Sequence, residues 1–159
     1  MDWWKQFKPK ACSTKLKAST KAEALEEVVK NLLASEQLPT DLGAAALKAL
    51  TSREEIGTTG IGMGVAIPHV TLPGLDSAAC SLSIHADGLD WDAVDGAPVQ
   101  ILFTVLRPSE PGEAHDPERH LAMMNWIAKL AREADFRSFA IRAKTKTELV
   151  NLLKEMSVV

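Results

Sequence analysis

Cysteine is scarce in this chain of 159 residues, which contains only Cys12 and Cys80. No CxxC spacing and no second pair occurs, so neither a disulfide framework nor a zinc site is indicated. No apolar run approaches the roughly 20 residues of a membrane span, and the N-terminus lacks the apolar core of a secretory signal. These absences predict a cytoplasmic protein with no stable membrane insertion and no bound metal.

Neither sign of charge predominates. The chain has 18 Lys and Arg against 21 Asp and Glu, a net charge of −3, which argues against general nucleic-acid binding. Its hydrophobic content of 46% and charged content of 25% are ordinary for a soluble globular protein. The length is sufficient for one domain with a well-buried core.

Four helices are predicted from start signals and apolar periodicity. Capping boxes begin at Thr20 and Thr145, and Asp116-Pro117-Glu118 combines an N-cap, a first-position proline and a first-turn acid. Another helix is predicted from Thr40 or Asp41 to about Ser52, and 136–140 is a short helical or connecting piece. The expected buried stripes are Ala22, Leu25, Val28, Val29, Leu32 and Leu33; Leu42, Ala45, Ala46, Ala49 and Leu50; Leu121, Met124, Ile127, Ala128 and Ala131; and Leu149, Leu152, Leu153 and Met156.

Strands are predicted between these helices. Residues 65–67, 78–85 and 101–106 are apolar or alternating, the last in the continuous form of a strand buried on both faces. Leu16 and the segment 91–99 are expected in further short strands. Helices and strands in this order predict an α/β single-domain sandwich with a mixed β-sheet flanked by helices on both faces.

The first dozen residues differ from the rest in composition. Residues 1–12 combine Trp3, Trp4 and Phe7 with three lysines, a pattern that suits contact with a membrane surface or a partner. A loosely packed extension is the simpler interpretation. We therefore divide the chain into an N-terminal extension, 1–12, and one domain, 13–159.

A glycine-rich segment precedes the most distinctive motif. Four glycines lie within residues 57–64, and an ordinary hairpin is the commonest reason for such a cluster. Backbone N–H groups around Gly60, Gly62 and Gly64 would alternatively suit a phosphate cradle. The spacing matches neither the dinucleotide fingerprint nor a P-loop. The proline that follows, Pro68, restricts its predecessor to extended geometry and would present His69 in a defined direction.

The segment from Arg53 to His69 reads REEIGTTGIGMGVAIPH. It resembles the signature of the type-2 IIA domains of the bacterial phosphoenolpyruvate-dependent sugar phosphotransferase system, which include fructose, mannitol and nitrogen-regulatory proteins. The resemblance extends roughly from Leu16 to Met156 and assigns 13–159 to such a domain. It implies a phosphotransferase without a cofactor, in which His69 accepts a phosphoryl group from a histidine-containing phosphocarrier protein. A IIB domain or a regulatory target protein would be the next partner.

Other candidate side chains have a plain and a functional interpretation. Arg53 suits a helix-end cation that complements the helix dipole, whereas the resemblance implies that it stabilises the phosphoryl charge. His120 suits a structural first-turn histidine, whereas the resemblance implies that it lies near His69 and donates to phosphate. A metal site of His69, His115 and His120 is a weaker alternative because no acidic or cysteine partner accompanies them. His85 is expected to be structural or exposed.

Two positions depart from the pattern that the resemblance implies. Met63 stands where relatives often have Asn, which removes a side chain that would help to order the loop. Val70 stands where Gly or Ala is usual and is expected to narrow access to His69. Cys80 is expected in a buried strand, unlike the loop cysteine that a fused IIB domain would phosphorylate. The alternative function is therefore a non-catalytic regulatory module that retains the IIA fold without efficient phosphotransfer.

Overall fold

The most apolar predicted strand, β5, lies at the centre of the sheet. Nearly all its residues are buried, as expected from a continuous apolar run. In the computed structural model, which describes residues 2–109 and 116–157, β5 pairs antiparallel with β4 on one side and parallel with β2 and β3 on the other. β1 adds antiparallel to β2. The strands are β1 (Gly60–Gly62), β2 (Val65–Ala66), β3 (His69–Leu72), β4 (Ala79–Leu89) and β5 (Val99–Pro108).

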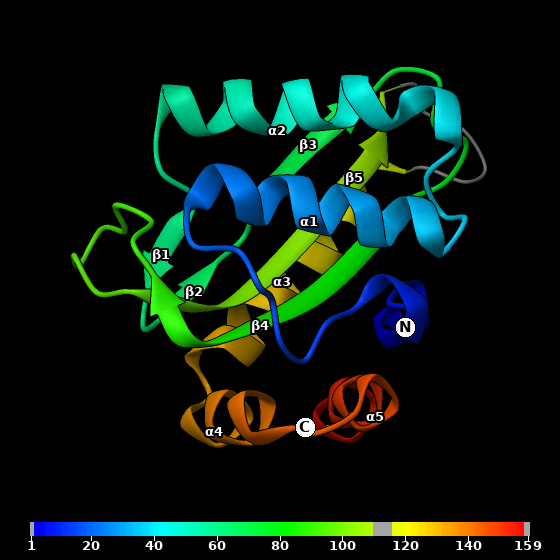
Figure 1. Ribbon diagram of the computed structural model, residues 1–159. Helices are drawn as coiled ribbons and strands as arrows, with labels where there is room; N and C mark the ends of the chain where they lie inside the picture. Colours follow the sequence, from blue (N-terminus) through cyan, green and yellow to red (C-terminus); the bar gives the residue numbers. More distant parts are fainter. Residues whose placement is uncertain (1, 110–115, 158–159) are drawn as a thin grey trace.

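Helices cover both faces of this mixed sheet, which confirms the predicted fold class (Figure 1). One core cluster joins the sheet to α1 and α2, and a second joins it to α3, α4 and α5. The helices are α1 (Lys21–Ala34), α2 (Gly43–Ile56), α3 (Pro117–Arg132), α4 (Ala134–Arg142) and α5 (Lys146–Met156), with 3-10 turns η1 (Trp3–Gln6), η2 (Pro9–Ala11) and η3 (Thr40–Leu42).

Three predicted helix starts are confirmed by their cap hydrogen bonds. Thr20 Oγ1 accepts from the N–H of Glu23, and Thr145 Oγ1 from that of Glu148. The carboxylate of Asp116 accepts from Glu118 N–H at 3.0 Å. Capping is a local interaction, which is why the sequence alone located these starts.

The buried faces of the helices depart from the predicted stripes. Ala24 is buried in α1 whereas Ala22 is exposed, and in α2 Ala45 is exposed. In α3 the core residues are Met123, Ile127, Leu130 and Ala131, whereas Leu121 is 62% exposed. The apolar side chains of these helices are compatible with two buried faces that differ by a small rotation about the helix axis. Packing against the sheet selects one of the two.

Several element boundaries also differ from the prediction. A 3-10 turn precedes α2, which continues to Ile56 instead of ending near Ser52. Leu16 is in no strand, although its N–H donates to Ile84 O at 2.8 Å. Of the segment 91–99, only Val99 lies in a strand, and the preceding residues form an irregular loop in which Trp91 is fully buried. β4 continues beyond His85 to Leu89.

The N-terminal segment is packed more tightly than a loose extension. Phe7 is 1% exposed, and Ala11 and Cys12 are fully buried. The Phe7 ring meets Phe103 of β5 edge-on at 6.0 Å and lies 5.9 Å from the Trp126 ring of α3. Residues 2–12 therefore contribute to both core clusters, Phe7 and Cys12 to the one under α3, α4 and α5 and Ala11 to the one under α1 and α2. A domain boundary at residue 12 stays a prediction.

Candidate functional site

β2 and β3 are two halves of one interrupted strand. Val65 pairs with Ile101 and His69 pairs with Val105, so both halves keep one register against β5. The interruption includes Pro68, which has no N–H for a sheet, but its carbonyl accepts from Val105 N–H at 3.0 Å. His69 therefore begins β3 at a fixed position beside the central strand.

The His69 ring has a defined tautomer. Its Nδ1 lies 2.7 Å from the backbone oxygen of Ile67. A carbonyl oxygen only accepts, so Nδ1 carries the proton and donates it to this bond. In the neutral ring the lone pair is then on Nε2, which is the form required of a nucleophilic imidazole.

The side chain of His69 faces the layer of α3, α4 and α5. Successive side chains of a strand point to opposite faces, and Ile67 belongs to the core cluster under these helices. His69, two residues later, falls on the same side. Val70 packs against the cluster under α1 and α2. The expectation that Val70 narrows access to His69 is therefore wrong, since its side chain lies on the opposite face of the sheet.

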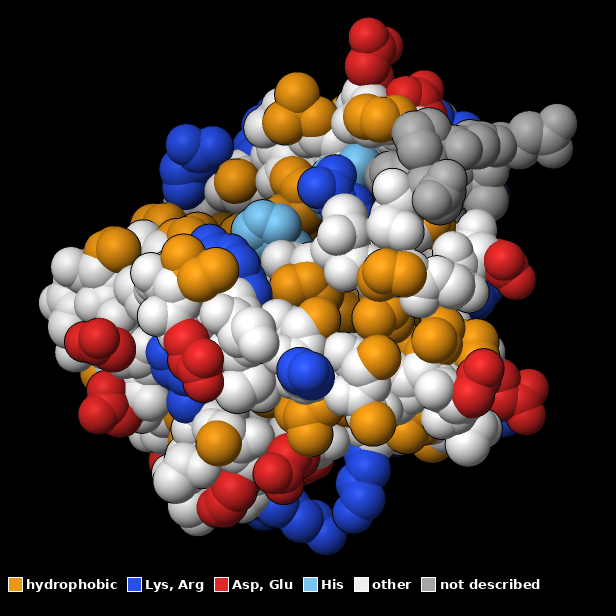
Figure 2. All heavy atoms as spheres, turned by 90° about the horizontal axis from the view of Figure 1, so that it is seen from above, with side chains coloured by type: hydrophobic (Ala, Val, Ile, Leu, Met, Phe, Trp, Pro, Cys, Tyr) orange, Lys and Arg blue, Asp and Glu red, His pale blue; other side chains and the backbone are white. Residues whose placement is uncertain are grey.

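His120 reaches the same face from the first turn of α3. It is partly buried and lines a cavity of about 140 Å³ with Arg107, Arg119 and Asp116. Trp3, Gln6, Ser77, Ala78 and Met123 complete the lining. Figure 2 shows a face with histidine side chains, Lys or Arg atoms beside them and acidic side chains toward the rim. The structure thus places His69 and His120 on one side of the sheet.

Arg53 approaches from the last turn of α2. Its Nη1 donates to Gly57 O at 2.7 Å. Ile67 N–H donates to Thr59 O at 3.0 Å, which extends the antiparallel register of β1 and β2 back toward α2. Continued further, this register brings Gly57 to the level of His69, and α2 itself packs against β3. Arg53 and His69 therefore belong to one region of the fold.

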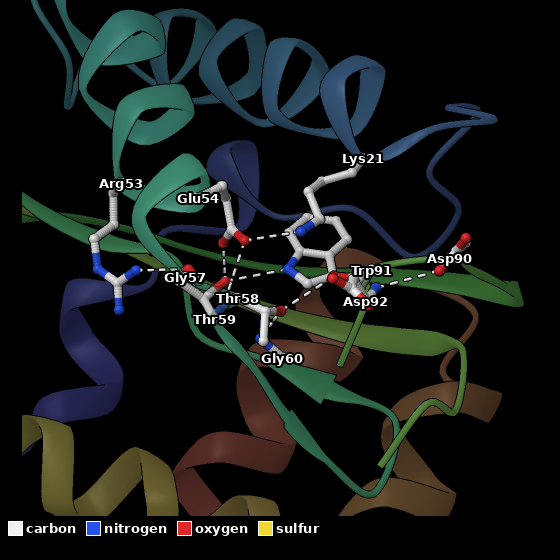
Figure 3. A network of polar contacts seen from close by, with 10 residues as sticks. All are labelled: Lys21, Arg53, Glu54, Gly57, Thr58, Thr59, Gly60, Asp90, Trp91 and Asp92. Carbon is white, nitrogen blue, oxygen red and sulfur yellow. Dashed lines mark hydrogen bonds and ion pairs between the residues drawn. The ribbon is translucent and has the colours of Figure 1, made fainter. Parts of the chain in front are cut away.

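Glu54 anchors the segment between α2 and β1 (Figure 3). Its side chain is 6% exposed, ion-pairs with Lys21 Nζ at 2.9 Å, and accepts from both the N–H and the hydroxyl of Thr59. Trp91 Nε1 donates to Thr59 Oγ1 at 3.1 Å, and Lys21 lies over the Trp91 ring. Sequence reasoning missed this network. Its only signal was the Arg-Glu pair of the signature, because Lys21 and Trp91 are remote in sequence.

The glycine cluster forms a hairpin. Met63 and Gly64 connect β1 to β2 with φ of 60° and 76°, and positive φ at both positions is the requirement of a two-residue type I′ turn. The Asp95 carboxylate accepts from Met63 N–H at 3.0 Å. At Gly60 an added Cβ would lie 2.8 Å from that of Ala93. Turn geometry therefore accounts for Gly64 and close packing for Gly60.

The phosphate cradle at Gly60, Gly62 and Gly64 stays a prediction. The geometry limits which of these N–H groups could bind a phosphoryl group on His69. Gly60 N–H already donates to Thr58 Oγ1 at 3.1 Å. Gly64 precedes His69 by five residues of extended chain, a separation on the order of 16 Å. Within the glycine-rich segment, the backbone closer to His69 is therefore that of the residues before β1, and not that of the hairpin turn.

The remaining described histidine and the two cysteines have structural positions. His85 Nε2 lies 2.7 Å from Ala18 O and donates to it. Cys12 and Cys80 are buried and free, and Cys80 lies in β4 as expected. Burial raises the pKa of Cys12 to about 11 and also raises the pKa of Cys80.

Among residues 2–109 and 116–157, no group of three or more His, Cys, Asp or Glu side chains is placed to hold a metal. His115, part of the alternative metal site, lies outside the described residues. Within the same ranges, no helix is both long and apolar enough to cross a membrane.

A family model described as "Phosphoenolpyruvate-dependent sugar phosphotransferase system, EIIA 2" matches residues 5–156. The chain belongs to this family. Among its EIIA 2 relatives, a "Nitrogen regulatory protein" of Pseudomonas aeruginosa is 36% identical over 138 residues, which cover 86% of this chain and 84% of the relative. A "PTS system fructose-specific EIIA component" of Haloferax volcanii is 32% identical over 112 residues, 70% of each chain.

Solved structures of EIIA domains have the same fold. The nitrogen regulatory protein IIA-Ntr of Neisseria meningitidis superposes with a TM-score of 0.79 at 25% identity, covering 94% of this chain and 97% of that one. The mannitol IIA enzyme of Escherichia coli, in its complex with phosphorylated IIB, gives a TM-score of 0.71 at 14% identity, with 92% and 95% coverage. This second likeness concerns the fold alone.

Proposed function

We propose that this EIIA 2 protein accepts a phosphoryl group on Nε2 of His69 from a histidine-containing phosphocarrier protein. It then passes the group to a IIB domain or uses it as a regulatory switch in the cytoplasm. The observation that carries this proposal is the hydrogen bond from His69 Nδ1 to Ile67 O, which leaves the Nε2 lone pair as the nucleophile. Membership of the EIIA 2 family supports a role in the phosphotransferase system.

The transfer itself needs few groups. The Nε2 lone pair of His69 attacks phosphorus in line as the bond from phosphorus to the donor histidine nitrogen breaks, and that nitrogen takes back its electron pair. The Nδ1 proton stays on the ring, where Ile67 O stabilises the positive charge that develops. Arg53 and His120 supply donors for the phosphoryl oxygens in this scheme.

The identity of the acceptor is tested by labelling. The protein is incubated with phosphoenolpyruvate, enzyme I and the phosphocarrier protein, and acid-labile phosphate is measured by intact mass. We expect one phosphate on the wild type and on a His85→Gln control, and none on His69→Ala. Labelling of His69→Ala to the wild-type extent would refute the assignment.

Arg53 and His120 are expected to hold the phosphoryl group without carrying it. Loss of a hydrogen bond to a charged group costs about 1.5–3 kcal/mol, so His120→Ala and Arg53→Ala should each slow labelling by roughly ten- to a hundredfold. The measurement is the single-turnover rate from the phosphorylated donor. Unchanged rates in both variants would remove the two residues from the site.

A regulatory output is the second candidate, and the relatives named nitrogen regulatory protein favour it. Added negative charge on His69 would change which protein docks over the surrounding surface. Capture of partners from the native cytoplasm with phosphorylated and unphosphorylated protein tests this output. Identical partner sets would exclude the switch, and a IIB-containing permease as the main partner would favour transport. Binding of regulatory targets by His69→Ala with unchanged affinity would favour the non-catalytic module.

A further inference from the structure

Arg107 lies on the same face of the sheet as His69. Directly paired residues of neighbouring strands point their side chains the same way, and Arg107 pairs with Thr71, two residues after His69. The burial pattern of β5 agrees, because Phe103 and Val105 both belong to the core under α3, α4 and α5. Arg107, two residues beyond Val105, continues that row toward the cavity that it lines with His120.

The separation of Arg107 and His69 suits a shared ligand. Neighbouring strands lie about 4.8 Å apart and rise about 3.3 Å per residue, so a step of one strand and two residues separates their Cα atoms by roughly 8 Å. Across this separation, the long side chain of Arg107 can reach a phosphoryl group on Nε2 of His69. Arg107 can approach it from the central strand, while Arg53 approaches from the end of α2.

The electrostatic environment of Arg107 also favours an anion. Its side chain is only partly exposed. Among residues 2–109 and 116–157, its guanidinium forms no ion pair or hydrogen bond with a carboxylate. A partly buried guanidinium is stabilised by an anionic partner such as a carboxylate or a phosphoryl group, whose oxygens accept its N–H groups. The cavity wall adds Arg119, His120 and the start of α3, and Asp116 is the acidic residue in the described lining.

We propose that Arg107 is a second phosphoryl-binding arginine of the His69 site, in addition to Arg53. The inference rests on the proposed function, since it concerns the same phosphoryl group. Sequence reasoning did not single out Arg107. It follows Leu106 at the end of an apolar strand, and its relation to His69 depends on a parallel pairing across 36 residues (Thr71 with Arg107).

The test compares Arg107→Gln, Arg107→Lys and the control Arg132→Gln, which alters an exposed arginine at the far end of α3. The first readout is the single-turnover rate of His69 phosphorylation by the phosphorylated phosphocarrier protein. The second is the ³¹P chemical shift of the phosphohistidine, which a merely structural residue would not move. Urea midpoints establish that each variant is folded.

We expect Arg107→Gln to slow phosphorylation about ten- to a hundredfold and to shift the ³¹P resonance, with partial rescue by Arg107→Lys and no change in Arg132→Gln. A folded Arg107→Gln protein with the wild-type rate and the wild-type ³¹P shift would overturn the inference while leaving the proposed function intact. A wild-type protein that takes no label on His69 would instead refute the proposed function, and the inference with it.

Discussion

Glu54, near the candidate site, is a buried carboxylate whose charge and hydrogen bonds must all be matched by partners. Its buried carboxylate accepts from Lys21 and from two groups of Thr59. Glu54→Gln removes the charge and turns part of the acceptor into a donor, which leaves these partners poorly matched. We expect a loss of about 1–3 kcal/mol in the free energy of unfolding, measured by urea denaturation.

The neighbouring Glu55→Gln is the matched control, because Glu55 is exposed. It should change the free energy of unfolding by less than about 0.5 kcal/mol. Equal stability of the Glu54 and Glu55 variants would show that the network of Figure 3 does not hold the segment before β1.

The buried thiols give the protein a predicted alkaline sensitivity. Burial raises the pKa of Cys12 from 9.0 to about 11. The folded state therefore keeps a proton that the unfolded state releases above pH 9, so this contribution is complete below pH 9 and is lost as the pH rises toward 11. Its size is on the order of 2–3 kcal/mol.

Unfolding free energies measured from pH 8 to pH 11 should fall less steeply for Cys12→Ala than for the wild type. Ellman's reagent should also leave both thiols of the native wild type unmodified at pH 8 and modify both after denaturation. Rapid modification of the native protein would contradict the burial of Cys12 and Cys80.

Sequence reasoning could single out His69, Arg53 and His120 because a contiguous signature or a recognisable helix start contains each of them. It could not find the partners of Glu54, or the relation of Arg107 to His69. The ion pair of Glu54 with Lys21, the hydrogen bond of Trp91 with Thr59 and the pairing of Arg107 all join residues more than 30 positions apart. Local sequence patterns identify side chains that are capable of chemistry, and the tertiary structure determines which of them lie close together.

At the scale of elements, the β1–β2 hairpin contains a strained residue. Met63 has a φ of 60°, and left-handed backbone costs most L-residues roughly 1–2 kcal/mol, less for Asn. Met63→Asn should therefore raise the free energy of unfolding by roughly 0.5–1 kcal/mol, although it removes the contact of Arg137 Nη1 with Met63 Sδ at 3.7 Å. Thermal and urea unfolding would measure the gain.

Met63→Val is the opposing control, because a β-branched side chain tolerates positive φ poorly. It should destabilise the protein. If Asn lowered stability as much as Val does, the turn would not be limited by backbone conformation.

Helix positions were more predictable than helix orientations. Caps such as Thr20 with Glu23 act within one turn, so the sequence contains the whole interaction. The buried face of α3 depends on how the helix packs, for example through the contact of Trp126 with Phe7. Leu121 and Met123 are both apolar candidates for that face. Packing against the sheet buries Met123 and leaves Leu121 exposed.

For the molecule as a whole, the N-terminal segment is expected to be part of the stable fold. Phe7 is buried between Phe103 and Trp126. Phe7→Ala should cost about 3–5 kcal/mol in the free energy of unfolding, the usual loss for a buried aromatic side chain. Lys8→Ala, at the exposed next position, should have little effect. A Phe7→Ala protein with the wild-type urea midpoint would support the loose extension predicted from the sequence.

The fold class followed from the order of helix and strand signals, but the strand order did not. Nothing in the sequence indicated that 65–66 and 69–72 would form one interrupted strand beside β5, since both runs are short and a proline separates them. The register against β5 emerges only from the complete sheet.

The interrupted strand also determines when the site can exist during folding. β4 and β5 are antiparallel neighbours joined by residues 90–98, whereas β2 and β3 pair with β5 across 36 residues, as His69 does with Val105. Pairing across the longer segment requires closure of a larger loop, and the loss of chain entropy precedes the contacts that offset it. The surroundings of His69 are therefore expected to assemble late, when the rest of the sheet is already paired. A chain in which only β4 and β5 had paired would contain His69 without the neighbouring strand that fixes its position.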